Sequence, residues 1–125
     1  LNQIGDPEAE SFAVAYLKGE ALRGLERHSE ALESFDEALG HNPDSVPVLM
    51  AMAWCYKRTD QLSQAISSME RAYQVSPREA VVLYNLSCYW SLAGNKVQAL
   101  SWLGRALRLD QNLRELVAHR ERRGL

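Results

Sequence analysis

The 125-residue sequence is poor in the residues that bind metals or form cross-links. Its two cysteines, Cys55 and Cys88, lie 33 positions apart, and its histidines are scattered at His28, His41 and His119. Zinc sites need closely spaced ligands, and disulfide-stapled folds need several cysteines. We therefore expect no metal site, no cofactor and no disulfide, and we interpret both cysteines as free thiols.

Long apolar runs and clustered basic charge are also absent. No stretch approaches the roughly 18 consecutive apolar residues that span a bilayer, and no charged-then-apolar leader opens the chain. The net charge of -2 argues against a nucleic-acid or membrane-surface binder, because both need a concentrated basic surface. These features predict a cytoplasmic protein. The chain begins at Leu1 rather than methionine, so a leader or further repeats could precede it.

The sequence has no recognisable catalytic motif. No serine, cysteine or histidine stands in a nucleophile motif, and no glycine-rich loop could hold a phosphate. The adjacent acids Asp36 and Glu37 fall on the outer face of a helix by their period, and a lone acid such as Glu20 is usually a binding contact. We therefore expect the protein not to be an enzyme.

What the sequence does contain is a pattern that recurs every 34 residues. Small residues occupy three places in each copy: Gly19, Ala31 and Ala38; Ala53, Ala65 and Ala72; Ser87, Ala99 and Ala106. Larger apolar residues keep the same phase: Ala15, Leu49 and Leu83; Leu22, Tyr56 and Trp90; Phe35, Met69 and Leu103. Pro43 and Pro77 close the first two copies, and Gln111 stands at that place in the third. A register kept three times indicates internal repeats.

This period and signature resemble the tetratricopeptide repeat (TPR), a helix-turn-helix unit whose helices cross at small residues. The resemblance runs from Phe12 to Leu113. It implies an all-α fold, a right-handed α-solenoid of antiparallel helix pairs that pack on one another. We expect one domain with repeats over about 12–45, 46–79 and 80–113. An amphipathic helix over about 112–123 is expected to cap the open end.

Start and stop signals predict six helices before the cap. Their expected ranges are 7–25, 29–39, 46–58, 62–75, 78–92 and 96–109. Asp6 followed by Pro7 is typical of a helix start, with Asp6 as the cap and Pro7 in the first helical place. The same pair could instead close an earlier repeat, because Pro7 precedes Pro43 by 36 residues.

Lys18 and Gly19 are the unusual residues of the first repeat. Glycine in mid-helix costs about 0.5–1 kcal/mol against alanine, so we expect a close approach of the partner helix at Gly19. The TPR pattern usually has leucine just before this small position, and Met52 and Leu86 fit it in the later repeats. A lysine is tolerable at position 18 if no earlier unit covers it.

The resemblance also implies where function lies. In TPR proteins the first helix of each pair lines a concave groove that commonly binds an extended peptide or a helix of a partner protein. Mapping the groove-facing places onto this sequence gives eleven candidate contact residues: Tyr16, Glu20, Arg23, Met50, Trp54, Lys57, Arg58, Val81, Tyr84, Cys88 and Ser91.

These residues indicate the chemistry of a protein or peptide partner. The apolar and aromatic members, among them Trp54 and Tyr84, would receive apolar anchors. Lys57 and Arg58 would favour an acidic flank beside those anchors. Some TPR proteins clamp the terminal carboxylate of chaperone tails, but only Asn85 matches that set of residues here. We therefore expect a non-catalytic interaction module of a different specificity.

Charge is unevenly distributed along the chain. Residues 1–45 hold ten acids and three bases, a net -7, whereas residues 46–125 hold six acids and eleven bases, a net +5. This asymmetry fits ordinary solvated helix faces, and it also fits head-to-tail association or two patches for one partner. The alternative function is therefore a structural spacer or a self-associating scaffold segment, and the sequence leaves the oligomeric state open.

Overall fold

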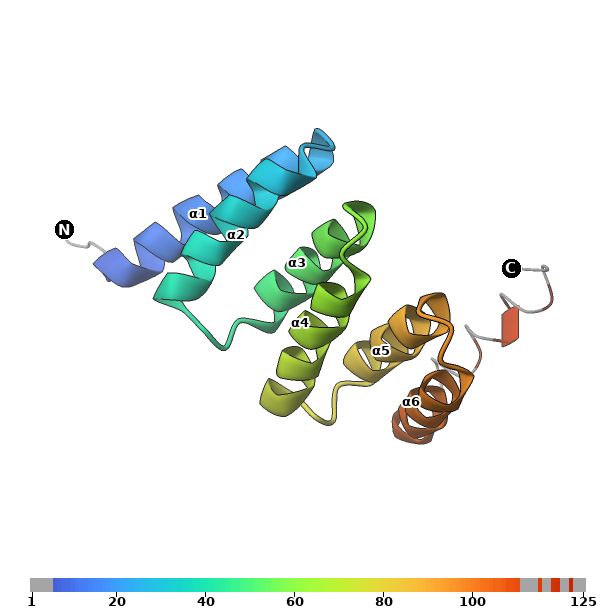
Figure 1. The fold of residues 1–125 in the computed structure, drawn as a ribbon. Coiled ribbons are helices and arrows are strands. Elements are labelled where there is room, and N and C mark those ends of the chain that lie inside the picture. Colours follow the sequence, from blue (N-terminus) through green and yellow to red (C-terminus); the bar gives the residue numbers. More distant parts are fainter. Residues whose placement is uncertain (1–5, 111–114, 116–117, 120–121, 123–125) are drawn as a thin grey trace.

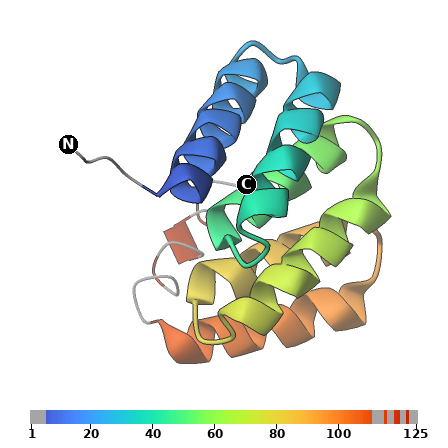
Figure 2. The same ribbon diagram turned by 90° about the vertical axis from the view of Figure 1, so that its left-hand side faces the viewer.

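The computed structural model describes residues 6–110 and, beyond them, Glu115, Ala118, His119 and Arg122. Residues 6–110 form six helices: α1 (Pro7–Gly24), α2 (His28–His41), α3 (Val46–Arg58), α4 (Leu62–Val75), α5 (Ala80–Leu92) and α6 (Lys96–Leu109). Successive helices run antiparallel as three hairpins, and the hairpins stack side by side (Figure 1). Each hairpin is turned relative to its neighbour (Figure 2). The described residues contain no strand, which confirms the predicted all-α solenoid.

Three side chains cap the first turns of helices, as local sequence signals predict. Asp6 Oδ1 accepts a hydrogen bond from the Glu8 amide at 3.0 Å, so Asp6 and Pro7 are a helix start. Ser45 Oγ accepts from the Val48 amide at 3.4 Å, and Asn95 Oδ1 accepts from the Gln98 amide. These caps satisfy amides that have no partner within their own helix.

The observed helix bounds differ from the expected ones mainly in two places. α2 is longer at both ends, His28–His41 rather than 29–39. α5 begins at Ala80 rather than at residue 78, because Glu79 donates its amide to the Ser76 carbonyl in a turn before the helix starts. The four described residues beyond position 110 are helical, but most of the expected cap helix over 112–123 lies outside the described residues.

One turn geometry closes every hairpin. Glu26, Asp60 and Gly94 follow one another at 34-residue intervals, and all three have positive φ, at 62°, 62° and 81°. After each of them, the next amide bonds back to the carbonyl five residues earlier, at 2.9, 2.8 and 3.0 Å. This is the helix-ending arrangement in which a left-handed residue is needed, usually glycine. The first helix of each hairpin therefore ends at the same position of the repeat, and the second helix leaves the turn in the same direction.

The core is a layer between helices. Eight of the nine small repeat positions are buried, and only Ala99 on α6 is partly exposed. Phe35 and Met69 are fully buried, and Leu103, their counterpart on α6, is half-buried. The small residues let the two helices of a hairpin approach closely while the larger ones fill the space beside the crossing. The last described hairpin is thus the least covered of the three.

Candidate partner-binding groove

The first helices of the three hairpins line one concavity of about 1590 Å3. Ten of the eleven predicted contact residues line it: Tyr16, Glu20 and Arg23 from α1, Met50, Trp54 and Lys57 from α3, and Val81, Tyr84, Cys88 and Ser91 from α5. Arg58 is not among the lining residues and packs instead against Trp54. The structure therefore brings the predicted residues together, while their contact with a partner remains a prediction.

Trp54 is the aromatic centre of the α3 segment. Its half-buried ring packs against the hydrophobic core. The Lys57 Nζ atom and the Arg58 Cζ atom each lie 4.5 Å from the ring centroid. Cations at this distance are attracted to the negative face of an indole. Neither cation forms an ion pair within the described part of the chain. Two uncompensated positive charges are thus fixed beside an aromatic side chain.

The α1 side of the concavity is held by local contacts. Arg23 donates two hydrogen bonds to the Glu20 carboxylate, at 3.1 and 3.0 Å. This bidentate pair compensates the charge of Glu20, so the carboxylate is not left as an isolated base. Tyr16 lies between the rings of Phe12 and Phe35, with centroids 5.9 and 6.1 Å away. The α1 contribution is therefore pre-positioned before any partner arrives.

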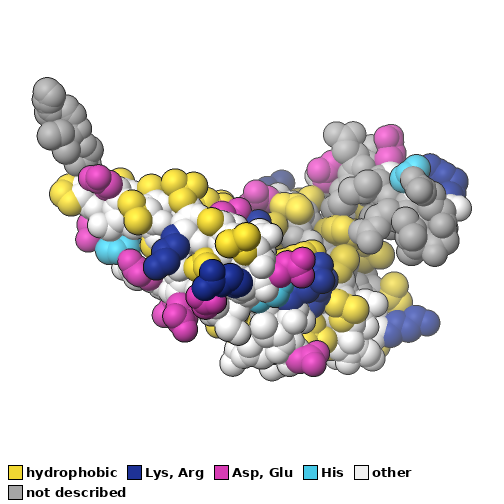
Figure 3. All heavy atoms as spheres, turned by 90° about the horizontal axis from the view of Figure 1, so that it is seen from above, with side chains coloured by type: hydrophobic (Ala, Val, Ile, Leu, Met, Phe, Trp, Pro, Cys, Tyr) yellow, Lys and Arg dark blue, Asp and Glu magenta, His cyan; other side chains and the backbone are white. Residues whose placement is uncertain are grey.

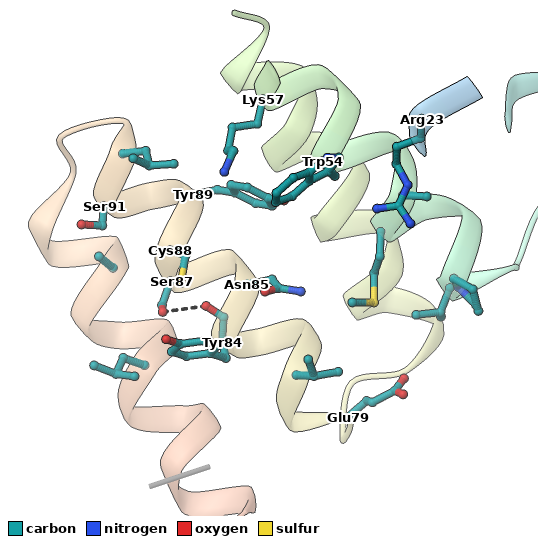
Figure 4. Close-up of a pocket in the computed structure, with 18 of the residues that line it drawn as sticks. Arg23, Trp54, Lys57, Glu79, Tyr84, Asn85, Ser87, Cys88, Tyr89 and Ser91 are labelled. Carbon is teal, nitrogen blue, oxygen red and sulfur yellow. Dashed lines mark hydrogen bonds between the residues drawn. The ribbon is translucent and has the colours of Figure 1, made fainter. Parts of the chain in front are cut away.

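The α5 side offers apolar surface with a polar edge. Val81 is 43% exposed, and Tyr84 and Cys88 are half-buried. Ser87 Oγ donates to the Tyr84 carbonyl at 2.7 Å, which satisfies this hydroxyl inside the helix (Figure 4). Trp54 and Lys57 enter the same concavity from α3 (Figure 4).

The concavity extends further than the sequence predicted. Lys96, Leu100 and Leu103 of α6 also line it. The prediction missed them because it assigned the groove to first helices alone. Leu103 is the counterpart of the fully buried Phe35 and Met69, so its place in the repeat indicated packing within the hairpin.

The Cys55 thiol and the Tyr89 phenol near the concavity are not activated. Burial raises the pKa of the Cys55 thiol, and it also raises the pKa of Tyr89. Both groups therefore stay protonated at neutral pH, and a protonated thiol is a poor nucleophile. Within residues 6–110 and the four described residues beyond, no group of three histidine, cysteine or acidic side chains could hold a metal ion. No helix in the described part of the chain is both long and apolar enough to cross a membrane.

Three stacked antiparallel hairpins, small residues at the crossings and a concavity lined by the first helices define an α-solenoid of the TPR class. A sequence model of the family described as the Psidin N-terminal TPR repeats region matches residues 7–97. The chain therefore belongs to this TPR family. Proteins of this class generally mediate protein–protein interactions and are typically not enzymes.

Known proteins share the repeat and the fold. Sperm-associated antigen 1 from Mus musculus is 33% identical over 76 residues, which is 60% of this chain and 8% of that protein. The solved structure of YrrB, a TPR protein, superposes with a TM-score of 0.78 at 22% identity, covering 89% of this chain and 57% of YrrB. MamA from Desulfovibrio magneticus RS-1 gives 0.76 at 19% identity, covering 81% and 57%. The two structural likenesses concern the fold alone.

Proposed function

We propose that this protein binds a peptide or helix of a partner protein in the concavity, without catalysis. The observation that carries the proposal is the convergence of half-exposed aromatic and apolar side chains from three successive first helices on one surface. All three hairpins contribute to this surface, so we propose that the repeats over 12–45, 46–79 and 80–113 function together as one domain. YrrB, which has the same fold, is described as having an unusual peptide-binding site.

The apolar anchors of the partner would bind between α3 and α5. Trp54 and Met50 face this space from α3, and Val81 and Tyr84 face it from α5. Large aromatic side chains are favoured as binding anchors because they bury much surface while losing few rotatable bonds. Methionine adapts its shape to different apolar partners. This composition favours a partner segment with two apolar side chains on one side.

The charge beside Trp54 selects an acidic flank. Lys57 and Arg58 already lie against the ring, so they need little ordering to meet a carboxylate. A carboxylate placed there would form a charge-assisted contact at the edge of the apolar site. Arg23 is occupied by Glu20 and contributes less to this preference. The proposed ligand is therefore an apolar segment with an adjacent aspartate or glutamate.

Binding of synthetic peptides by fluorescence anisotropy tests this proposal. One set pairs two apolar residues with an aspartate or glutamate, and the matched set carries lysine in its place. We expect the acidic set to bind and the lysine set to bind at least roughly tenfold more weakly. Equal binding of both sets would refute the acidic preference. If neither set of peptides binds, the proposed groove function is refuted.

Two variants place the bound peptide on the protein. Trp54→Ala/Tyr84→Ala should abolish most of the binding, because truncating central aromatic anchors costs about 2 kcal/mol or more each. Gln74→Ala, at an exposed position of α4 outside the concavity, should bind as the wild type does. Unchanged binding by the double variant would show that the peptide binds elsewhere.

A further inference from the structure

Besides the concavity, a hollow of about 450 Å3 lies at the junction of the second and third hairpins. α4 begins directly after one hairpin turn and α5 ends directly before the next, so the hollow lies on the side of the array where these turns are. Figure 3 views the array from this side, and hydrophobic side chains reach the surface among charged ones. This junction hollow is lined by Leu62, Ser63, Ile66, Ser67 and Glu70 of α4, by Trp90 of α5 and by Ala93, which follows α5.

The junction hollow is separate from the concavity. None of the described residues lines both of them. Near the end of α5, Tyr89 and Leu92 line the concavity, whereas Trp90 and Ala93 line the junction hollow. The end of α5 is therefore a wall between the two, and a ligand in the junction hollow is not the peptide proposed for the concavity.

The floor of the junction hollow is apolar. Ile66 is 6% exposed, and the half-buried Leu62 and Trp90 pack against the same core. The Nε1 atom of Trp90 is buried and has no hydrogen-bond partner among the described residues. The indole therefore lines the hollow with its carbon atoms, and this surface can receive a cation, whereas an acceptor cannot reach the N–H group.

The other two tryptophans each carry a cation that Trp90 does not have. On α3, the Nζ atom of Lys57 lies 4.5 Å from the ring centroid of Trp54, three residues earlier. On α6, the Cζ atom of Arg105 lies 4.2 Å from the ring centroid of Trp102, also three residues earlier. Within the described part of the chain no cation lies over Trp90, and the residue three positions after it is an alanine.

The hollow lies where that cation is absent, and acceptors surround it. Ala93, the residue three positions after Trp90, is one of its lining residues. Ser63, Ser67 and Glu70 follow one another at spacings of four and three residues, so they share one face of α4. Their side-chain oxygens have no hydrogen-bond or ion-pair partner among the described residues. The junction hollow therefore offers an aromatic surface, a carboxylate and two hydroxyls, and it contains no positive charge to compensate them.

We infer that the junction hollow binds an arginine side chain of a partner protein. The guanidinium group lies on the ring of Trp90, in the position that a cation of the chain takes at the other two tryptophans. Its five N–H donors lie in one plane and can bond to the carboxylate of Glu70 and to the serine hydroxyls at the same time. The methylene groups pack on Leu62 and Ile66.

Lysine fits the same place less well, because its ammonium group has three donors and no planar surface to stack on the indole. The serines and the glutamate at the rim are exposed, so a side chain can enter the hollow while its backbone stays outside. This second site goes beyond the binding of a peptide in the concavity.

NMR titration of the 15N-labelled full chain tests the inference. The three tryptophans give separate indole N–H signals, and Trp90→Phe identifies the signal of Trp90. The probe is a blocked alanine–arginine–alanine tripeptide, and matched peptides carry lysine or the neutral citrulline in place of arginine. The arginine peptide should shift the Trp90 signal until it saturates, the lysine peptide should bind more weakly, and the citrulline peptide should cause no saturable shift. No saturable shift with up to about 50 mM arginine peptide overturns the inference, as does equal binding of the arginine and citrulline peptides.

Variants test the two groups that hold the guanidinium. Glu70→Gln should weaken binding of the arginine peptide roughly tenfold, because it removes the charge of the acceptor. Glu37→Gln is the matched control, since it neutralises an exposed, unpaired acid of α2 outside the hollow, and it should bind as the wild type does. Ala93→Arg supplies the absent cation from the chain itself, so it should block the peptide. Circular dichroism checks that each variant is folded. Binding of wild-type strength by Glu70→Gln or by Ala93→Arg contradicts the inference.

The same titration keeps the junction hollow apart from the concavity. Trp54→Ala/Tyr84→Ala, which removes the aromatic anchors of the concavity, should bind the arginine peptide as the wild type does, because neither residue lines the junction hollow. Loss of binding in this double variant, or a saturable shift of the Trp54 signal in place of the Trp90 signal, would place the arginine in the concavity and overturn the inference. The two sites can therefore fail independently.

Discussion

A Cβ atom added at Gly19 would lie 2.5 Å from Cε1 and 2.6 Å from Cδ1 of Phe35. Phe35 is completely buried, so its ring has no free space into which it could withdraw. The absence of a side chain at position 19 is thus the condition for a phenyl ring at position 35. This close approach explains why a glycine stands in the middle of α1 despite its cost to the helix.

Gly19→Ala should therefore destabilise the protein even though alanine is the better helix former. Overpacking of this kind costs about 1–3 kcal/mol, which outweighs the roughly 0.5–1 kcal/mol gained in helix propensity. Gly40→Ala is the matched control, because Gly40 lies on exposed surface of α2 with nothing within 4 Å of the added Cβ. The control should raise the free energy of unfolding, measured by urea denaturation, while Gly19→Ala lowers it.

The equivalent pairs in the other hairpins predict a rescue. Ala53 is paired with Met69 in the second hairpin, so a methyl group at the crossing coexists there with a flexible side chain. We expect Gly19→Ala to cost less in a Phe35→Met background than in the wild type, with a coupling free energy of about 0.5–3 kcal/mol. Strict additivity of the two substitutions would contradict a direct contact between positions 19 and 35.

Much of the fold could be predicted because its signals are local or periodic. Asp6, Ser45 and Asn95 mark helix starts, and the small residues at 34-residue intervals fix the crossings. The turns were harder to predict, since Glu26 is an unusual residue for a left-handed conformation, and Asp60, which adopts it more readily, is also common elsewhere. Their spacing from Gly94 contained the information, but residue type alone did not.

The concavity could be predicted in outline and not in its borders. Helical spacing from the small residues places Tyr16, Trp54 and Tyr84 on the concave side, where the structure has them. Arg58 is one of the eleven predicted contact residues, but it does not line the concavity. It follows Trp54 by four residues and stacks on that ring. The residues that α6 adds to the concavity depend on how the last described hairpin packs against its neighbours. The hydrophobic period of one helix does not determine that packing.

Ala65→Leu should weaken the crossing of α3 and α4. Ala65 is completely buried opposite the small position at Ala53, so three extra carbon atoms must displace packed neighbours. The expected loss is about 1–3 kcal/mol of unfolding free energy, measured by thermal or urea denaturation. Gln64→Leu, at the adjacent exposed position, introduces the same side chain without filling the crossing. An Ala65→Leu melting curve equal to that of the control would refute the crossing assignment.

Substitutions at the left-handed turn residues should change the stability of the protein in opposite directions. Gly94→Ala should cost about 1–2 kcal/mol, because an L-residue with a Cβ is strained at positive φ. Glu26→Gly at the equivalent turn relieves the same strain, and we expect it to stabilise the protein by a smaller amount, since glycine adds freedom to the unfolded chain. Denaturation of the two variants beside the wild type measures both effects. Loss of stability in Glu26→Gly would show that the lost side chain and the added freedom of the unfolded chain together outweigh the relieved backbone strain.

The two cysteines should differ in reactivity and in their response to pH. Cys55 is completely buried, whereas Cys88 is half-buried and lines the concavity. A thiol reagent such as DTNB should modify Cys88 in the native protein and Cys55 only when the protein unfolds. Labelling of Cys55→Ala and Cys88→Ala assigns the two reactions. Equal native rates for both thiols would contradict the difference in burial.

Burial raises the pKa of Cys55 in the folded protein above its value in the unfolded chain, which is about 8.5. The stability that depends on its protonated form is therefore fully present below that value and is lost as pH rises through the folded pKa. We expect the unfolding free energy of the wild type to fall more steeply between about pH 8 and 10 than that of Cys55→Ala. The pKa of Tyr89 is also raised, mainly by burial and to a smaller extent by Cys88 and Cys55, so most of its contribution is common to both proteins. Parallel pH profiles would show that the thiolate of Cys55 is tolerated in the folded state.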